Sequence, residues 1–163
     1  MTMQANVKNI NGWSKKRVGE IATRIVVRAG TSSTPYIEIG DIDVERKQYS
    51  VKDKPSPGIC VSAENKDVIV SKVRPTRGAV VQLQRRAFVS PAFSVLRAAS
   101  ADDADFLFYA LSREDFFRYL GTLETGTTYP SCDDKDVENY EISFPENQKE
   151  RKKVAEIISA INI

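Results

Sequence analysis

The feature that most restricts the fold of this chain is a change of hydrophobic pattern near residue 100. Between residues 36 and 98 the apolar residues form short runs rich in β-branched types, separated by glycine and proline turns, which is typical of strands. From residue 100 to 121 the segment SADDADFLFYALSREDFFRYLG has the composition and cap spacing of helices. A further strand-like segment, YEISFP, and a final amphipathic helix follow. This order predicts an α+β fold, a single compact domain of mixed or antiparallel β-sheet with packed helices.

Several turn and cap signals place the individual elements. The predicted strands before residue 100 are YIEIGDI, DVIVSKV, AVVQLQ, RRAFVS and AFSVLRA. The polar segment 45–58 predicts a long loop or a loose hairpin, and RPTRG predicts a tight connection between two strands. GWSKKRVGEIATRI predicts a helix near the start, with Ser14 as a candidate N-cap. Ser100 and Ser112 each precede an acidic residue with N-cap spacing, and Gly121 is the predicted helix stop.

The last stretch, ENQKERKKVAEIISAINI, predicts a capped helix with one apolar stripe. Asn147 and Glu150 have the spacing of an N-cap and its N3 residue. The stripe could pack on the chain's own domain, or it could pair with another helix, although about two heptads are too short to form a coiled coil alone. We predict a domain over residues 1–146 and the beginning of a projecting helix over 147–163. The stripe residues are Val154, Ile157, Ile158 and Ile161.

The composition excludes several kinds of chemistry. The chain has no histidine, so it cannot hold a Ser-His-Asp triad, a Cys-His dyad or a histidine-ligated zinc ion. With 24 basic and 22 acidic residues, its net charge of +2 does not by itself indicate a nucleic-acid partner. The start lacks a signal peptide's apolar core, and no apolar run is long enough to span a membrane. These patterns predict a cytoplasmic, non-enzymatic protein with no membrane partner, metal or cofactor.

An acidic segment offers the one alternative with catalysis. CDDKD, followed by Glu138 and Glu141, supplies carboxylates of the kind that a metal-dependent nuclease needs. These acids crowd into one polar loop, whereas such nuclease sites place them on adjacent strands near a lysine. A solvated loop and a helix cap are therefore the preferred interpretation of Asp133, Asp134 and Asp136. Neither GxGxxG nor GxxxxGK[ST] occurs, so no phosphate-binding glycine loop is predicted.

Two basic segments and one hydroxyl-rich turn are candidates for DNA contacts. SKVRPTRG and QLQRRAF carry arginine, lysine and glutamine, which bind phosphates and read base edges, and strand pairing between them could place both along one edge. GTTYPS supplies small hydroxyl side chains that suit phosphate contacts. An ordinary solvated surface and a rigid polar turn are the competing interpretations. The candidate residues are Lys72, Arg74, Thr76, Arg77, Arg85 and Arg86, with Thr127, Thr128, Tyr129 and Ser131 as a second group.

The order of these segments resembles a target recognition domain of the specificity (S) subunit of type I restriction–modification systems. GWSKKRVGEIA is similar to the family's opening, PYIEIGDID to its next strand, and DVIVSKVRPTRGAVV to its Asp-Ile-Leu-Ile-Ser-Arg strand and glycine turn. AFVSPAFSVLRA and DADFLFYALSREDFFRYLGTLETGTT resemble the later strand, the Phe-Leu helix and the Gly-Ser/Thr-Thr loop. ISFP followed by ERKKVA resembles Ile-x-Ile/Leu-Pro and Glu-Gln-x-x-Ile-Ala, with Arg151 where glutamine is usual. The similarity runs from about Gly12 to Asn162.

The resemblance implies a function without catalysis. Such a domain reads one half of a split double-stranded DNA site. It docks methyltransferase subunits, which transfer a methyl group from S-adenosylmethionine to adenine, and a restriction subunit can join. A full subunit holds two such domains apart by paired helices, so the terminal stripe would meet the helix of a second recognition domain. This chain would be a naturally short half-subunit or a truncated piece, which we expect to be a monomer. The alternatives are the nuclease above and a module that mimics a specificity subunit without binding DNA.

Overall fold

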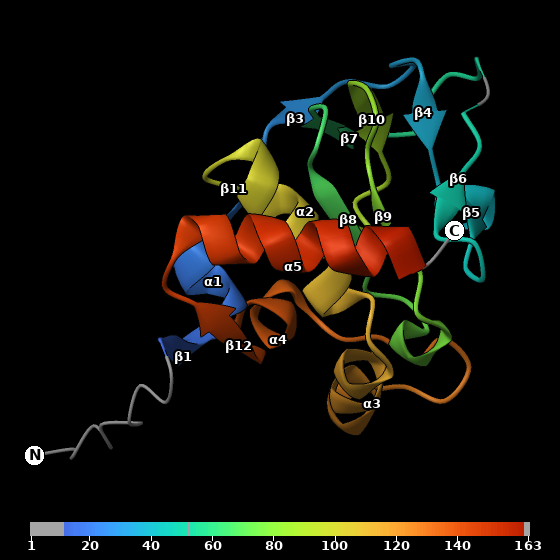
Figure 1. Ribbon diagram of the computed structural model, residues 1–163. Helices are drawn as coiled ribbons and strands as arrows, with labels where there is room; N and C mark the ends of the chain where they lie inside the picture. The colour runs from blue at the N-terminus through green and yellow to red at the C-terminus, as the bar shows by residue number, and fades with distance from the viewer. Residues whose placement is uncertain (1–11, 52, 162–163) are drawn as a thin grey trace, which may run out of the picture.

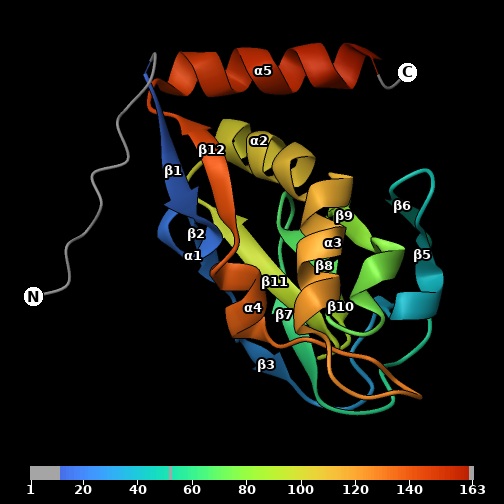
Figure 2. The same cartoon turned by 90° about the horizontal axis from the view of Figure 1, so that it is seen from below.

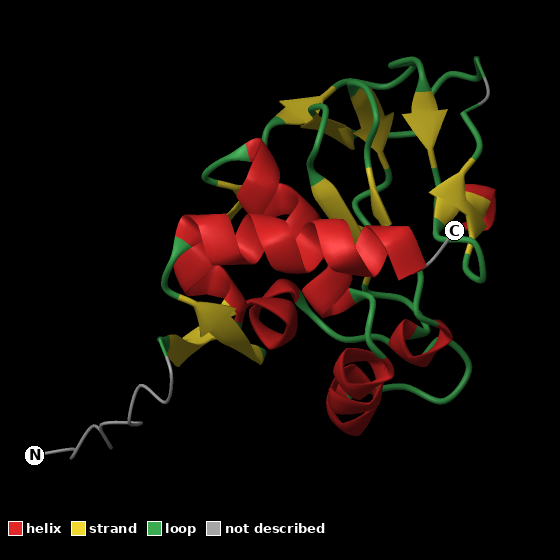
Figure 3. Cartoon of the chain, viewed as in Figure 1, coloured by secondary structure: helices red, strands yellow, loops and turns green. Residues whose placement is uncertain are grey.

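The computed structural model describes residues 12–51 and 53–161 and confirms the α+β fold (Figures 1 and 3). The helices are α1 (Val18–Ile21), α2 (Ala101–Leu111), α3 (Glu114–Leu123), α4 (Asp134–Glu138) and α5 (Gln148–Ile161), with 3₁₀ helices η1 (Ile39–Asp41) and η2 (Pro75–Arg77). The strands are β1 (Trp13–Arg17), β2 (Ala22–Arg24), β3 (Arg28–Ala29), β4 (Tyr36–Ile37), β5 (Ile42–Asp43), β6 (Gln48–Tyr49), β7 (Cys60–Ala63), β8 (Val68–Ser71), β9 (Val80–Gln82), β10 (Ala87–Val89), β11 (Phe93–Ala98) and β12 (Glu141–Pro145).

The elements form successive layers, which Figure 2 shows edge-on. An antiparallel sheet with the order β2-β11-β8-β9 lies at the centre, and α2 packs on one of its faces. A second sheet, β3-β7-β10-β4, covers the other face, and its β10–β4 pair is parallel. The hairpin β5–β6 and the antiparallel pair β1–β12 stand apart from both sheets. The mixed sheet arrangement thus agrees with the predicted fold class.

The strand β8 shows why the central sheet has this position. All of its residues are buried, and successive side chains of a strand point to opposite faces. Val68 and Val70 join the core under the helices, together with Leu107 of α2 and Leu120 of α3. Ile69 joins the second core between the two sheets. A strand covered on both faces is largely apolar, which explains the run VIV at residues 68–70.

The predicted helix at the start of the chain is wrong for most of its length. Residues 13–17 form β1, which pairs antiparallel with β12, and only Val18–Ile21 forms a helical turn. Ser14 is therefore not an N-cap, and its hydroxyl donates to the Glu146 carboxylate instead. The indole N–H of Trp13 donates to Glu150 at 2.7 Å. This segment forms a strand despite its partly helical spacing, because pairing with β12 supplies hydrogen-bond partners for its backbone N–H and C=O groups.

The helical segment after residue 100 is present, but two of its predicted boundaries are wrong. Ser100 caps α2 as predicted, since its hydroxyl accepts from the Asp103 N–H at 3.2 Å. Ser112 instead ends α2, with its hydroxyl donating to the Phe108 carbonyl at 2.6 Å, and Arg113 precedes α3. Gly121 does not stop α3, which continues to Leu123. A Cβ at Gly121 would lie 2.7 Å from Thr76 Cγ2, so close packing explains this glycine.

The segment YIEIGDI is not one continuous strand. The chain forms the short strand β4, turns through η1, and then starts the hairpin β5–β6. Alternating apolar residues could not indicate this break, because Ile37 lies wholly in the core between the sheets while Ile39 packs at its border. Of the described residues within 45–58, predicted as a long loop or a loose hairpin, only Gln48–Tyr49 forms a strand, β6, and it pairs with β5 of the preceding segment. The tight connection RPTRG is confirmed by η2 between the paired strands β8 and β9.

The terminal helix α5 begins as predicted and lies across α2 (Figure 2). Asn147 caps it, because its side-chain oxygen accepts from the Lys149 N–H at 2.9 Å. The face against α2 is centred on Arg151 and Ala155, which are buried. The predicted stripe lies beside this face. Val154 and Ile158 are half-buried, whereas Ile157 is 52% exposed and Ile161 is 74% exposed.

Candidate nucleic-acid interface

The two loops that carry the candidate DNA contacts are joined by backbone hydrogen bonds. The Arg74 N–H donates to the Pro130 carbonyl at 2.7 Å, and the Cys132 N–H donates to the Lys72 carbonyl at 2.9 Å. Val73 forms an isolated antiparallel bridge with Ser131, which also bridges Thr125. The basic turn at 72–78 and the hydroxyl-rich loop at 126–131, predicted separately, therefore form one surface. We call this surface the joined loops.

Close packing on α3 fixes the shape of the basic turn. Gly78 has a φ of 73°, and a Cβ at this position would lie 2.6 Å from a ring carbon of Phe117. Lys47 from the β5–β6 hairpin donates from Nζ to the Gly78 carbonyl at 2.7 Å and lies 4.6 Å from the Phe117 ring centre. Burial lowers the pKa of Lys47 below its ordinary value. No sequence pattern indicated that Lys47 supports this turn, because the hairpin lies about thirty residues before it.

The side chains of the joined loops leave several polar groups accessible. Arg77 is exposed and has no ion pair within the described residues. Arg74 is half-buried, and its guanidinium lies 5.7 Å from the centre of the Tyr129 ring, which is 72% exposed. Thr127 and Thr128 are exposed beside it. The arrangement presents cations, hydroxyl groups and an aromatic face together, a combination that suits phosphates and bases.

Three of the candidates have structural roles within this region. Lys72 donates to the Asp134 carboxylate at 3.1 Å, so its charge is already paired. Thr76 is exposed but packs its methyl group against Gly121. Ser131 is half-buried, and its backbone holds the loop closed. These residues shape the joined loops.

Arg85 and Arg86 are not part of the joined loops. They follow β9, whereas η2 precedes it, so the length of that strand separates the two basic groups. Arg86 lies 3.6 Å from Glu64 and 5.6 Å from the Phe88 ring centre. Arg85 is exposed, without an ion pair among the residues that the structure describes. Pairing of β8 with β9 therefore placed the two basic segments at opposite ends of one strand.

The acids proposed for a nuclease are engaged in local structure. Asp133 accepts from the Asp136 N–H at 3.0 Å, and Asp136 accepts from the Asp133 N–H at 2.9 Å, which caps α4 reciprocally. Asp134 pairs with Lys72, and Glu138 pairs with Arg24 at 2.6 Å. Over residues 12–51 and 53–161, no group of three or more potential metal ligands is placed to hold an ion. No observation in this segment favours a metal-dependent reaction.

The cysteine beside these acids is a poor nucleophile. Burial, followed by the charge of Asp136, raises the pKa of the Cys132 thiol to about 11. Only a thiolate attacks efficiently, and the ionised fraction at neutral pH is very small at that pKa. Cys60 lies in β7 of the second sheet and is almost fully buried. The thiols therefore offer no covalent chemistry at the joined loops.

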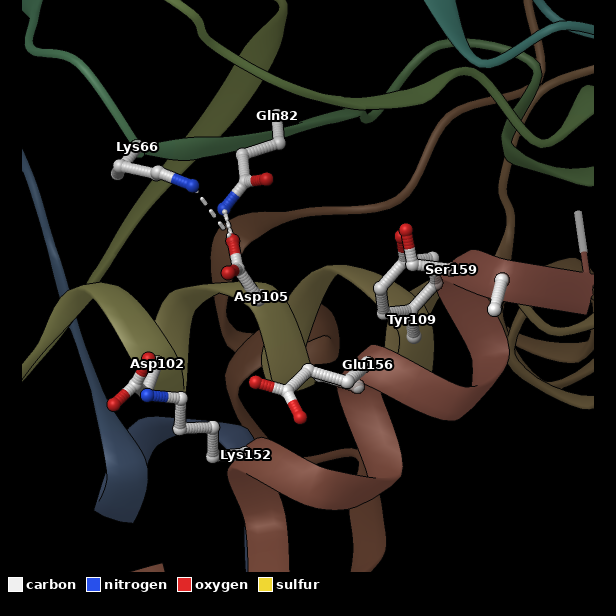
Figure 4. A pocket seen from close by; sticks show the side chains of 10 residues that line it. Lys66, Gln82, Asp102, Asp105, Tyr109, Lys152, Glu156 and Ser159 are labelled. Carbon is white, nitrogen blue, oxygen red and sulfur yellow. Dashed lines mark hydrogen bonds and ion pairs between the residues drawn. The ribbon is translucent and has the colours of Figure 1, made fainter. Parts of the chain in front are cut away.

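A polar cavity of about 450 Å³ lies between α2 and α5, away from the joined loops (Figure 4). The Asp105 carboxylate at its edge accepts from Lys66 Nζ and from Gln82 Nε2, both at 2.9 Å. Gln82 thus points into the helix layer and is not placed to read DNA with Arg85 and Arg86. The lining side chains of Lys152 and Glu156 bring opposite charges to the same cavity. No reactive pair of nucleophile and base lines it.

No helix in the described ranges is both long and apolar enough to cross a membrane.

Comparisons with known proteins identify the family. The profile of the family described as "Type I restriction modification DNA specificity domain" matches residues 11–163. No curated protein matches the chain. The fold is similar to that of a chain in a solved structure that concerns complex assembly and conformational transition of the type I R-M system. The two chains are 23% identical, with a TM-score of 0.76 over 93% of this chain and 43% of that one.

Two further solved structures have the same fold. The HsdS subunit from Thermoanaerobacter tengcongensis is 23% identical, with a TM-score of 0.72 over 98% of this chain and 44% of that chain. The type I restriction-modification system S subunit from M. genitalium is 17% identical, with a TM-score of 0.61 over 98% of this chain and 40% of that chain. This chain therefore spans less than half the length of each of these three chains. Because the family profile covers nearly all of it, the chain belongs to the type I restriction modification DNA specificity domain family.

Proposed function

We propose that this chain recognises one half of a split double-stranded DNA site as a domain of a type I specificity subunit. The observation that carries the proposal is the joining of the basic turn and the hydroxyl-rich loop through Arg74 and Pro130. Several cations elsewhere are paired with carboxylates, as are Arg97 with Asp67 and Arg151 with Asp103. Arg74 and Arg77 have no such partner among the described residues, and unpaired cations on one surface favour a phosphate-bearing ligand.

The terminal helix supports a role in assembly. Residues 1–146 would form the recognition domain, and residues 147–163 would begin the helix that separates it from a second one. Val154 of the stripe packs against the core of the domain and Ile158 is half-buried, so this side of the helix faces the domain. Ile157 and Ile161 stay exposed and are the residues proposed to meet a second helix. Apolar residues with helical spacing are what a paired helix requires.

The chain would act through partner subunits. We propose that it directs methyltransferase subunits, and in a larger complex a restriction subunit, to the DNA that it binds. The histidine-free sequence and the structural engagement of the acidic segment support a role without catalysis in this chain. A complex of this kind would work in the cytoplasm, where the DNA and the methyl donor are present.

The test is selection from a pool of randomised DNA duplexes, with the methyltransferase subunit present. The wild-type protein should enrich one short sequence. Arg77→Glu should weaken binding to every duplex and lower the salt dependence by about one unit of slope for each lost phosphate contact. Lys153→Glu is the matched control, because it reverses an exposed cation on α5, at the opposite edge of the molecule from the loop after α3 in Figure 2.

Two results would overturn the proposal. Recovery of no enriched sequence with the methyltransferase bound would identify a module that binds the partner but not DNA. Magnesium-dependent cleavage by the purified chain, lost in Asp134→Ala, would identify a nuclease. A loss of binding in Lys153→Glu equal to that in Arg77→Glu would show that general charge, and not the joined loops, governs affinity.

A further inference from the structure

The residue that links the two loops has an unusual backbone conformation. Arg74 has a φ of 47° and a ψ of 56°, the left-handed region, which residues with a side chain seldom adopt. Its N–H donates to the Pro130 carbonyl, and the buried Pro75 follows it. Strained conformations of this kind persist where the surroundings hold them, and they cluster at binding sites. The backbone therefore fixes the point from which the Arg74 side chain leaves the surface.

The Arg74 side chain is oriented as well as anchored. Its guanidinium lies over the Tyr129 ring, 5.7 Å from the ring centre, while the ring itself is largely exposed. Within the described residues it makes no side-chain hydrogen bond and no ion pair, so its N–H donors are unused. Arg77, three residues later, is exposed and has no aromatic partner among the residues that the structure describes. The two neighbouring arginines thus differ: the Arg74 guanidinium lies over an aromatic ring, and the Arg77 guanidinium has no such contact.

This difference indicates different ligands. A mobile cation can neutralise a phosphate from many positions, because that contact carries no sequence information. An oriented guanidinium presents two parallel N–H donors, and in the major groove this pair matches the O6 and N7 acceptors of guanine. Holding the side chain in the bound conformation also reduces the entropy lost on binding. The left-handed backbone and the ring beneath the guanidinium both restrict where the Arg74 side chain can point, and a phosphate contact does not need that restriction.

We propose that Arg74 reads a guanine in the recognised half-site, and that Tyr129 is the positioning residue that orients its guanidinium; this inference rests on the proposed function. The cation–π contact requires the ring of Tyr129 but not its hydroxyl group. Replacement by phenylalanine should therefore preserve the reading of guanine, and replacement by alanine should weaken it at the same base position.

The experiment compares enriched half-sites from randomised duplexes for the wild type and matched variants, each with the methyltransferase subunit bound. The wild type should enrich a half-site containing an invariant guanine. Arg74→Lys retains the charge, and Arg74→Gly suits the left-handed backbone, so both variants should fold. Both should lose discrimination at that guanine by about 5- to 150-fold, the range expected for one bidentate contact, and retain the other preferences. Tyr129→Phe should match the wild type, and Tyr129→Ala should lose part of the same preference.

The outcomes separate this inference from the proposed function. If the wild type enriches a half-site and Arg74→Gly keeps every base preference, Arg74 does not read a base and the inference is wrong. It is equally wrong if both Arg74 variants lose affinity for all sequences alike, since that is the behaviour of a phosphate contact. A shift at the same position in Tyr129→Phe would assign the reading to the hydroxyl group. Failure of the wild type to enrich any half-site would overturn the proposed function itself.

Discussion

Among the residues that attach the terminal helix to the domain, Arg151 should lower the stability most when it is replaced. Its guanidinium contacts the Asp103 carboxylate at 2.5 and 3.3 Å and donates to the carbonyls of Pro145 and Glu146 at 2.8 and 3.1 Å. It also lies 4.4 Å from the Phe144 ring centre. The Arg151 side chain is 10% exposed and the Asp103 side chain 15% exposed. One side chain therefore ties α5 to the first turn of α2 and to the end of β12.

The magnitude follows from the burial of this pair. Removing one partner of a buried ion pair costs about 3–5 kcal/mol, because the other charge stays buried without compensation. Asp103 lies in the first turn of α2, where the helix N-terminus stabilises an anion by roughly 0.3–1 kcal/mol. Alanine is favourable within a helix, so Arg151→Ala adds no propensity cost. The expected loss of unfolding free energy is thus about 3 kcal/mol, the lower end of the range.

The assay is urea denaturation followed by circular dichroism, with a thermal melt beside it. A loss of about 3 kcal/mol should lower the Tm by roughly 6–12 °C in a chain of this size. Asp103→Asn combined with Arg151→Ala should cost clearly less than the sum of the single changes, because they remove the same interaction. The control is Arg118→Ala, whose ion pairs are exposed and worth about 0.5 kcal/mol. A loss below about 1 kcal/mol in Arg151→Ala would refute the reasoning.

Three further changes have definite expected outcomes. Gly78→Ala should cost about 2–3 kcal/mol in urea denaturation, because alanine is strained at a φ of 73° and its Cβ would meet the Phe117 ring. Cys132, with a pKa of about 11, should resist iodoacetamide at pH 8 and react about tenfold faster per pH unit until pH approaches its pKa, measured by mass spectrometry. Trp13→Phe should lower the Tm, since it removes the indole hydrogen bond to Glu150 and costs about 1.5 kcal/mol.

Each of these predictions has a matched control. Gly58 does not have a left-handed φ, and a Cβ there would meet no atom within 4 Å. Gly58→Ala should therefore change the free energy of unfolding by less than about 0.5 kcal/mol. Cys60→Ser isolates the reaction of the remaining thiol, and fast alkylation at pH 8 would contradict the raised pKa. Equal stability of Gly78→Ala and the wild type would mean that the turn tolerates a side chain there. Glu150→Ala should lower the Tm as much as Trp13→Phe does. A much smaller effect would show that the hydrogen bond between the two side chains does not stabilise the fold.

Sequence signals correctly predicted the elements that depend on contacts between residues close together in the chain. The cap at Ser100, the cap at Asn147 and the paired strands flanking RPTRG all depend on residues close together in the chain, and all are present. The predictions that failed depended on distant partners. Trp13 lies in a strand because β12, far along the chain, pairs with it, and Gly121 lies within a helix because Thr76 packs against it. Helical spacing and glycine content cannot indicate such contacts.

The sequence by itself determined the α+β class, the order of the segments and the resemblance to a specificity-subunit domain, because these depend on periodicity and on short motifs in series. It also supplied the residue types of the candidate interface. Only the tertiary structure decided which of them act together. It joined Arg74 to Tyr129, paired Lys72 with Asp134, and left Arg85 beyond the far end of β9. The physical reason is that strand pairing fixes which turns lie at the same end of a sheet, and a linear sequence does not record that geometry.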